Sequence, residues 1–202
     1  MERIEAIEKL NQLVGRELHE LAHEYGVTIY RNGRVNKGWA GHVFERHLQI
    51  PINSAQSPNF GSWELKSIPL KLKKNGQLAF KETMAITMID AVNISQKEFH
   101  ESHLLAKLQK AVVVVRLVGE TVDQPTFIHS VVEFNLDEEL YETVKKDYDL
   151  VRNTILDPEK GFNALTGKMG HYIQPRTKGP GHGSISRAFY ARPRFLAEFI
   201  KF

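Results

Sequence analysis

Apolar residues recur at intervals of three and four along the first 25 positions of the chain. This spacing is typical of one face of an amphipathic helix. It is shared by Ile4, Ile7, Val14, Leu18, Leu21 and Tyr25. We therefore expect a helix over residues 3–25, ended by Gly26. A second helical stretch is predicted through residues 43–48.

Alternating and β-branched runs predict strands in the middle of the chain. Residues 63–68 alternate apolar and polar side chains, and residues 111–118 form a short β-branched run typical of a buried strand. A further strand is expected over residues 127–134. Asn75-Gly76 is a strong turn signal and predicts a hairpin within residues 70–90.

Three more helices are predicted among and after these strands. They cover residues 96–108, an acidic, solvated segment over residues 137–152 with Asp137 as its N-cap, and an amphipathic C-terminal segment. Helices and strands mixed in this order predict a domain of the α/β (α+β) class with a central sheet.

The composition excludes several kinds of chemistry. The 202 residues contain no cysteine, which rules out disulfides, thiolate zinc sites and a cysteine nucleophile. The longest purely aliphatic run is five residues, at 111–115, and stops at Arg116, so we expect no membrane span. The charged N-terminal segment has no pattern of a secretory signal, and we expect a cytoplasmic protein.

The net charge of +3 is unevenly distributed. Residues 151–202 contain nine Lys and Arg against three Asp and Glu, whereas the first 150 residues are net acidic. A basic C-terminal quarter indicates a surface that faces a polyanion. A solvated basic face without a ligand is an equally good interpretation of composition alone.

One motif suggests zinc. His19, Glu20 and His23 form a literal H-E-x-x-H, which on a helix can hold zinc with the glutamate as a base. The predicted apolar face centres near Leu21, so the two histidines are expected on the solvent side. A zinc protease therefore remains only a remote alternative.

A second motif suggests phosphate chemistry. Glu64 and Lys66 flank Leu65 on a predicted strand, and a two-residue step puts both side chains on one face. A carboxylate can bind Mg²⁺ there, the Leu65 carbonyl can add a ligand, and a lysine can position water. The alternative for this triplet alone is a surface ion pair.

The sequence around this triplet resembles the MutH-type branch of the PD-(D/E)xK nucleases. The resemblance rests on residues 37–45 (KGWAGHVFE), 59–69 (NFGSWELKSIP), 102–108 (SHLLAKL) and 187–190 (RAFY). Residues 15–21 are also similar to that family's opening, so the likeness extends over nearly the whole chain.

This resemblance implies a fold and a set of site residues. The implied fold is a restriction-endonuclease-like core, with a mixed central sheet flanked by helices and two lobes that form a DNA-binding cleft. Glu64 resembles the family's metal-binding carboxylate and Lys66 its catalytic lysine, while Glu45 and Lys107 resemble further active-site groups. One or two Mg²⁺ ions are the implied cofactor. We expect a single domain over residues 1–202, with a catalytic core at about 37–134 and a basic DNA-reading segment at about 151–202.

The chain departs from the family pattern at one position. Asn59 stands where the first acidic residue of the motif is expected, five residues before Glu64, a spacing more like that of MvaI/BcnI-type restriction enzymes. Asparagine keeps a carbonyl oxygen but lacks a charge that Mg²⁺ favours. Three explanations stay open: an inactivating Asp-to-Asn change, a natural site in which Glu45 supplies the carboxylate, or a relative that only binds DNA.

The implied partner is double-stranded DNA. Candidate contacts lie in the basic segment, where arginine can contact phosphates or guanine edges. They are Arg176, Lys178, His182, Arg187, Tyr190, Arg192 and Arg194. We expect a type II restriction endonuclease first, with a mismatch-repair nickase as the alternative and a silent DNA-binding relative after it. A cognate methyltransferase or mismatch-repair activators would be the corresponding protein partners.

Overall fold

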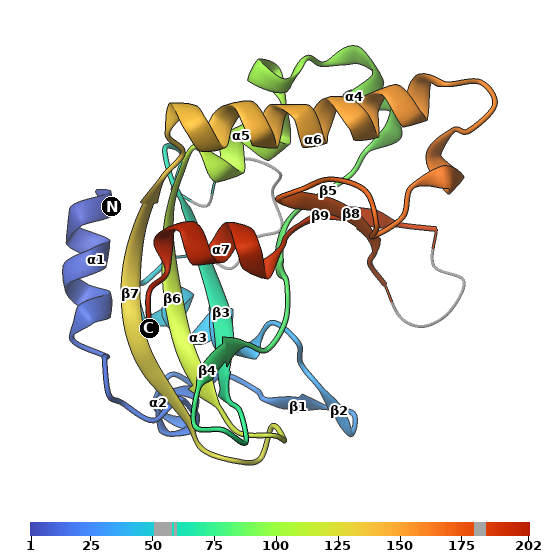
Figure 1. The fold of residues 1–202 in the computed structure, drawn as a ribbon. Coiled ribbons are helices and arrows are strands. Elements are labelled where there is room, and N and C mark those ends of the chain that lie inside the picture. Colours follow the sequence, from blue (N-terminus) through green and yellow to red (C-terminus); the bar gives the residue numbers. More distant parts are fainter. Residues whose placement is uncertain (51–57, 59, 180–184) are drawn as a thin grey trace.

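The computed structural model describes residues 1–50, 58, 60–179 and 185–202. It contains three β-sheets with helices packed around them (Figure 1). In chain order the elements are α1 (Arg3–Asn11), α2 (Leu18–Glu24), β1 (Tyr30–Arg31), β2 (Arg34–Val35), α3 (Trp39–His47), β3 (Glu64–Leu72), β4 (Leu78–Phe80), β5 (Met84–Met88), α4 (Ala91–Gln96), η1 (Phe99–Glu101), α5 (His103–Leu108), β6 (Lys110–Val118), β7 (Thr126–Asn135), α6 (Glu138–Leu156), η2 (Phe162–Ala164), β8 (Ile173–Thr177), β9 (Arg187–Ala191) and α7 (Pro193–Phe199).

The largest sheet has four strands in the order β4-β3-β6-β7. β3 and β6 run parallel, and the other pairs are antiparallel. A three-stranded antiparallel sheet, β5-β9-β8, lies beside it below α6, and β1 and β2 form a separate hairpin (Figure 1). The predicted mixed central sheet flanked by helices is confirmed.

Both faces of β6 are buried over residues 111–115, which explains the unbroken apolar run there. Val112 and Val114 belong to a hydrophobic cluster with α1, α2 and α3. Val113 and Val115 belong to a second cluster that also contains residues of β5, β8, β9, α6 and α7. The second cluster therefore joins the two larger sheets.

The predicted helix over residues 3–25 is wrong, because the structure has two helices there. Gly15 has a φ of 84°, which ends the run, and its N–H donates to the carbonyl of Ile128 on β7. α2 then begins after Glu17, whose side chain accepts from the N–H of Glu20. The backbone bond to β7 interrupts a periodicity that the sequence alone continues.

The single helix predicted over residues 96–108 is also wrong, because the structure has η1 and α5 in that range and a separate helix, α4, that ends at Gln96. Asp90 caps α4 and Ser102 caps α5, so each short helix has its own N-terminal cap. The hairpin, the three strands, the Asp137 cap and the C-terminal helix follow the prediction. α6 is not a solvated helix, since one of its faces buries Leu140, Val144, Tyr148 and Val151. No helix in the described part of the chain is long and apolar enough to span a bilayer.

Candidate active site

Glu64 and Lys66 lie at the start of β3 and meet there. Glu64 is only 1% exposed, and Lys66 Nζ lies 2.6 Å from Glu64 Oε1. Lys66 Nζ also donates to the carbonyl oxygen of Ile86 at 3.1 Å. Because Ile86 belongs to β5, this lysine bridges the four-stranded and three-stranded sheets next to the carboxylate.

Lys107 reaches the same carboxylate from α5. Its Nζ lies 3.2 Å from Glu64 Oε1, and its side chain is 10% exposed. The parallel ladder explains the meeting, since Glu64 pairs with Ala111 at the start of β6 and α5 ends just before that strand. One oxygen of Glu64 therefore contacts two ammonium groups. This arrangement depends on the starts of β3 and β6 lying side by side.

The surroundings make the charged form of Lys66 less favourable than it is in water. Its pKa is lowered from the ordinary value, chiefly by burial. The charges of Lys107 and Lys178 lower the pKa further, while the charge of Glu64 and the hydrogen bond to it act in the opposite direction. A lysine of this kind gives up its proton more readily than an exposed one, so a larger fraction of it is a neutral amine that can accept a proton from water.

Glu45 supplies a second carboxylate from α3. This helix is fixed by the buried side chains of Trp39, Ala40, Val43 and Phe44. Glu45 is half-buried, and its Oε2 is buried without a hydrogen-bond partner among the described residues. Burial raises the pKa of Glu45, the charge of Glu64 adds to this rise, and His42 and Lys66 oppose it.

These residues suit a hard divalent cation. Mg²⁺ prefers carboxylate and carbonyl oxygens, and the unpartnered oxygen of Glu45 is the kind of atom that such an ion would satisfy. No group of three or more His, Cys, Asp or Glu that could hold a metal occurs in the described ranges. Asn59 lies outside the described residues. Leu65 packs into the cluster beneath α1–α3, and its carbonyl ligand stays a prediction.

The H-E-x-x-H histidines do not form a comparable site. His19 is not on the solvent side as expected, because its side chain is half-buried. Its Nδ1 lies 2.6 Å from Glu17 Oε1, and its Nε2 lies 2.7 Å from the carbonyl of Val122. Both ring nitrogens of His19 are thus engaged within the protein, whereas His23 is exposed.

Some of the predicted DNA contacts project from the three-stranded sheet. Arg176 lies over the ring of Tyr190, with its Cζ 5.7 Å from the ring centroid, and donates to Thr83 Oγ1 at 3.1 Å. Lys178 is exposed directly after β8, and its charge acts on Lys66, so this end of β8 lies within electrostatic range of the Glu64 site. His182 lies outside the described residues.

Other predicted contacts have bonds within the protein. Arg192 Nη2 donates to the carbonyls of Gly167 and Met169 at 2.8 and 2.9 Å. Arg187 Nη1 donates to the carbonyl of Ile185 at 3.2 Å. Arg194 is exposed, with Nη1 3.4 Å from His171 Nδ1. Their roles toward DNA stay predictions.

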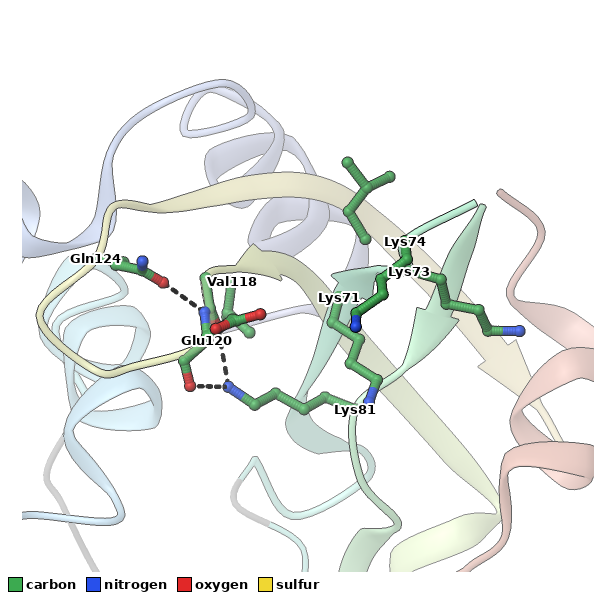
Figure 2. Close-up of a pocket in the computed structure, with 9 residues that line it drawn as sticks. Lys71, Lys73, Lys74, Lys81, Val118, Glu120 and Gln124 are labelled. Atoms are coloured by element: carbon green, nitrogen blue, oxygen red, sulfur yellow. Dashed lines mark hydrogen bonds between the residues drawn. The ribbon is translucent and has the colours of Figure 1, made fainter. Parts of the chain in front are cut away.

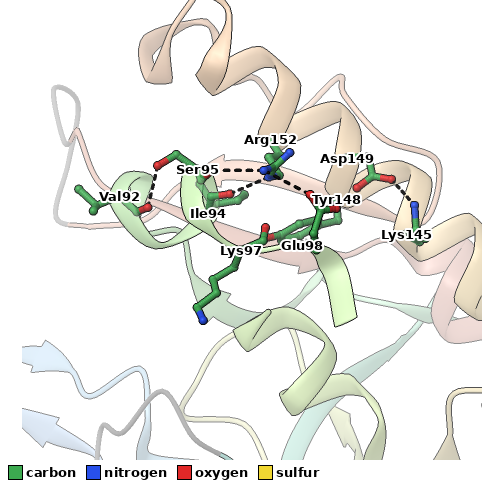
Figure 3. A network of polar contacts seen from close by, with 9 residues as sticks. All are labelled: Val92, Ile94, Ser95, Lys97, Glu98, Lys145, Tyr148, Asp149 and Arg152. Carbon is green, nitrogen blue, oxygen red and sulfur yellow. Dashed lines mark hydrogen bonds and ion pairs between the residues drawn. The ribbon is translucent and has the colours of Figure 1, made fainter. Parts of the chain in front are cut away.

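Part of the C-terminal positive charge also stabilises the fold. Arg152 on α6 donates to the carbonyls of Ile94 and Ser95 and lies 3.4 Å from Glu98 (Figure 3). The surplus charge counted in the sequence is therefore larger than the surplus that can face a ligand.

Asp147 is a positioning residue that the sequence pattern did not reveal. This carboxylate on α6 is 4% exposed and accepts from the backbone N–H groups of His171, Tyr172 and Ile173 at 2.6–2.7 Å. It fixes the start of β8, the strand that leads to Arg176 and Lys178. Its position in an acidic helix gives no signal of burial.

Comparison with known proteins gives consistent matches. A sequence model of the family described as "DNA mismatch repair enzyme MutH" matches residues 48–147. The DNA mismatch repair protein MutH of Vibrio campbellii is 24% identical, with 97% of this chain and 92% of that protein covered. The MutH protein of Shewanella woodyi is 28% identical, with 91% of this chain and 78% of that protein covered.

A solved structure is also similar to the chain. It is the restriction endonuclease MvaI in complex with its cognate DNA, at 14% identity and a TM-score of 0.40, with 90% of this chain and 94% of that one covered. A likeness at that level adds no argument beyond the observed fold.

Proposed function

We propose that the chain is a member of the MutH-type family of DNA nucleases, whose sequence model matches residues 48–147, and that it hydrolyses phosphodiester bonds of duplex DNA with Mg²⁺ as cofactor. The observation that carries the proposal is the arrangement at the start of β3. Glu64 contacts two largely buried lysines there, and Glu45, on which the charges of Glu64 and Lys66 act, has a buried oxygen without a hydrogen-bond partner among the described residues. A cytoplasmic location follows from this substrate.

One or two Mg²⁺ ions would be held by Glu64, Glu45, the oxygen of Asn59 and the carbonyl of Leu65. When bound, the cation supplies positive charge to a phosphate that gains negative charge in the transition state. Lys66 orients the attacking water and can accept its proton, because burial lowers the pKa of Lys66 and so increases the fraction of its amine that is neutral. Lys107 contacts the phosphate. The water oxygen bonds to phosphorus, the bond to the 3′ oxygen breaks, and that oxygen takes a proton, which leaves 5′-phosphate and 3′-hydroxyl ends.

Two modes of cleavage are candidates. The mismatch-repair relatives, matched over nearly their whole length, favour a nick in one strand that depends on activating repair proteins. The five-residue separation of Asn59 and Glu64 favours a double-strand cut by a restriction enzyme with a cognate methyltransferase. The relatives support the nickase at least as well as the restriction enzyme that we expected first.

The geometry of Glu45 supports one of the three explanations for Asn59. A carboxylate with a buried, unpartnered oxygen is suited to supply the charge that Asn59 lacks. On that explanation the chain keeps cleavage activity in its present sequence. If Asn59 is an inactivating change, cleavage requires its reversal.

Plasmid cleavage with Mg²⁺ tests the proposal and separates these alternatives. The unaltered chain and Asn59→Asp are each incubated with supercoiled plasmid and with hemimethylated duplex. Nicks at hemimethylated sites support the nickase, and linear product supports the restriction enzyme. If Asn59→Asp cuts no better than an active unaltered chain, Asn59 is not an inactivating change. The proposal fails if neither protein cuts either substrate, in which case a DNA-binding relative is the better description.

A further inference from the structure

The β1–β2 hairpin presents two arginines side by side. Asn32 and Gly33 form its two-residue loop with φ values of 50° and 70°, the left-handed conformations that a tight hairpin turn of this kind requires. Arg31 pairs with Arg34 directly across the ribbon, so the two side chains leave the same face. Like charges in this register destabilise a hairpin. No ion pair in the described part of the chain compensates either one, and both arginines are exposed.

The hairpin is nevertheless held firmly in position. Tyr30 Oη donates to Asp123 Oδ1 at 2.5 Å, which fixes the first strand to the β6–β7 turn. Asn36 donates its backbone N–H to the carbonyl of Ile29 at 2.8 Å and its side-chain amide to the carbonyl of Thr28 at 3.0 Å. The two arginines therefore project from an ordered base, and less conformational entropy is lost when they bind a ligand.

A cationic hollow lies between the hairpin and α3. Its lining residues are Arg31, Asn32, Arg34, Val35, Asn36, Lys37 and His42. An adjoining hollow shares Arg31 and His42 and adds Arg46. Among the described residues, no Asp or Glu lines either hollow. His42 lies on α3, three residues before Glu45, and its charge acts on Glu45, so the hollow borders the helix that carries Glu45.

We propose that the Arg31–Arg34 hairpin is a second phosphate clamp, which binds the DNA backbone beside the phosphate that is cut. This inference rests on the proposed function, because α3 lines the hollow with His42 and carries Glu45 of the proposed site, which is what identifies the polyanion as DNA. The basic end of β8, in the three-stranded sheet, lies within electrostatic range of Lys66. The β1–β2 hairpin and the strands β8 and β9 extend from the same side of the four-stranded sheet (Figure 1). Duplex DNA is thus contacted by both lobes, and the basic C-terminal segment is only one of its two contacts.

A second basic hairpin provides a matched control. Lys71, Lys73, Lys74 and Lys81 surround the β3–β4 turn, where Lys81 donates to the carbonyls of Gly119 and Glu120 (Figure 2). β3 starts at Glu64 and ends at Leu72, so this turn lies about 25 Å along the strand from the active site. Lys73→Gln/Lys74→Gln removes the same charge as Arg31→Gln/Arg34→Gln, from a hairpin remote from Glu64.

The test is the salt dependence of duplex binding, measured by fluorescence anisotropy without Mg²⁺ to prevent cleavage. Loss of two phosphate contacts should reduce the slope of log K against log salt by about 1.8 and weaken binding by up to about 60-fold at about 0.1 M salt. Lys73→Gln/Lys74→Gln should change binding no more than about twofold. Arg31→Gln/Arg34→Gln should melt at or above the temperature of the unaltered chain, because a repulsion is removed.

Three results would overturn the inference. It fails if Arg31→Gln/Arg34→Gln binds as the unaltered chain does, or if the lysine pair causes an equal loss, since net charge would then explain both effects. In those two cases the unaltered chain still binds duplex and the proposed function stands. If the unaltered chain binds no duplex at all, the proposed function and this inference fail together.

Discussion

Glu64→Gln is expected to destabilise the protein strongly, although it removes a charge from a proposed metal site. Glu64 is 1% exposed and contacts Lys66 and Lys107 at 2.6 and 3.2 Å. The substitution leaves two largely buried ammonium groups close together without a counter-ion. Removing one partner of a buried ion pair costs about 3–5 kcal/mol. For a chain of this size that loss lowers Tm by about 10 °C.

The direction in which a second substitution, Lys107→Met, changes Tm provides a stricter test of this prediction. Lys107→Met added to Glu64→Gln should raise Tm above that of Glu64→Gln alone, because it removes the repulsion between the two lysines. Alone, Lys107→Met leaves Glu64 paired with Lys66 and should cost less than Glu64→Gln. The expected departure from additivity is about 1–3 kcal/mol.

Thermal and urea denaturation in the presence of a chelator measure all four proteins of this cycle. A chelator is needed because Mg²⁺ would change the charge balance at Glu64. The reasoning is refuted if Glu64→Gln melts at or above the temperature of the unaltered chain, or if the two substitutions are additive. Either result would mean that Glu64 is not the counter-ion of the two lysines.

Three further outcomes are expected. Glu45→Gln should raise Tm at neutral pH without Mg²⁺ while it weakens cleavage, because a buried, unpartnered carboxylate is replaced by a neutral group. Folding raises the pKa of Glu45, so the free energy of unfolding of the unaltered chain should fall as pH rises from the ordinary carboxyl pKa to the raised one. Glu45→Gln should not show this fall, and melting curves recorded over a series of pH values check it. Asp147→Asn should lower the free energy of unfolding by about 3 kcal/mol, because an amide cannot accept hydrogen bonds from all three backbone N–H groups. Thermal melting measures this loss, with Asp149→Asn as the control.

Strand alternation was sufficient to predict part of the site. Because side chains alternate along a strand, the sequence alone puts Glu64 and Lys66 on one face of β3. The contact of Lys107 with Glu64 depends on the parallel pairing of β3 with β6. Only the family resemblance indicated that residue, since no local pattern connects positions 43 residues apart.

Long-range contacts explain most of what the sequence did not predict. The helix over residues 3–25 is broken by the bond between Gly15 and Ile128, which local periodicity cannot reveal. The buried bonds of Arg152 and Arg192 to backbone carbonyls reduce the basic surface that composition suggests. Asn32-Gly33 carries the same turn signal as Asn75-Gly76, so the β1–β2 hairpin also has a local sequence signal.

The measurement that tests the central claim most directly is Mg²⁺-dependent plasmid cleavage by Asn59→Asp with and without Lys66→Ala. The account predicts that Asn59→Asp cuts duplex DNA only when Mg²⁺ is present. It also predicts that Asn59→Asp/Lys66→Ala binds the same DNA with unchanged affinity and does not cut it. Equal cleavage by the two proteins, or no cleavage by Asn59→Asp with Mg²⁺, would contradict the assignment of Glu64 and Lys66 as the hydrolytic site.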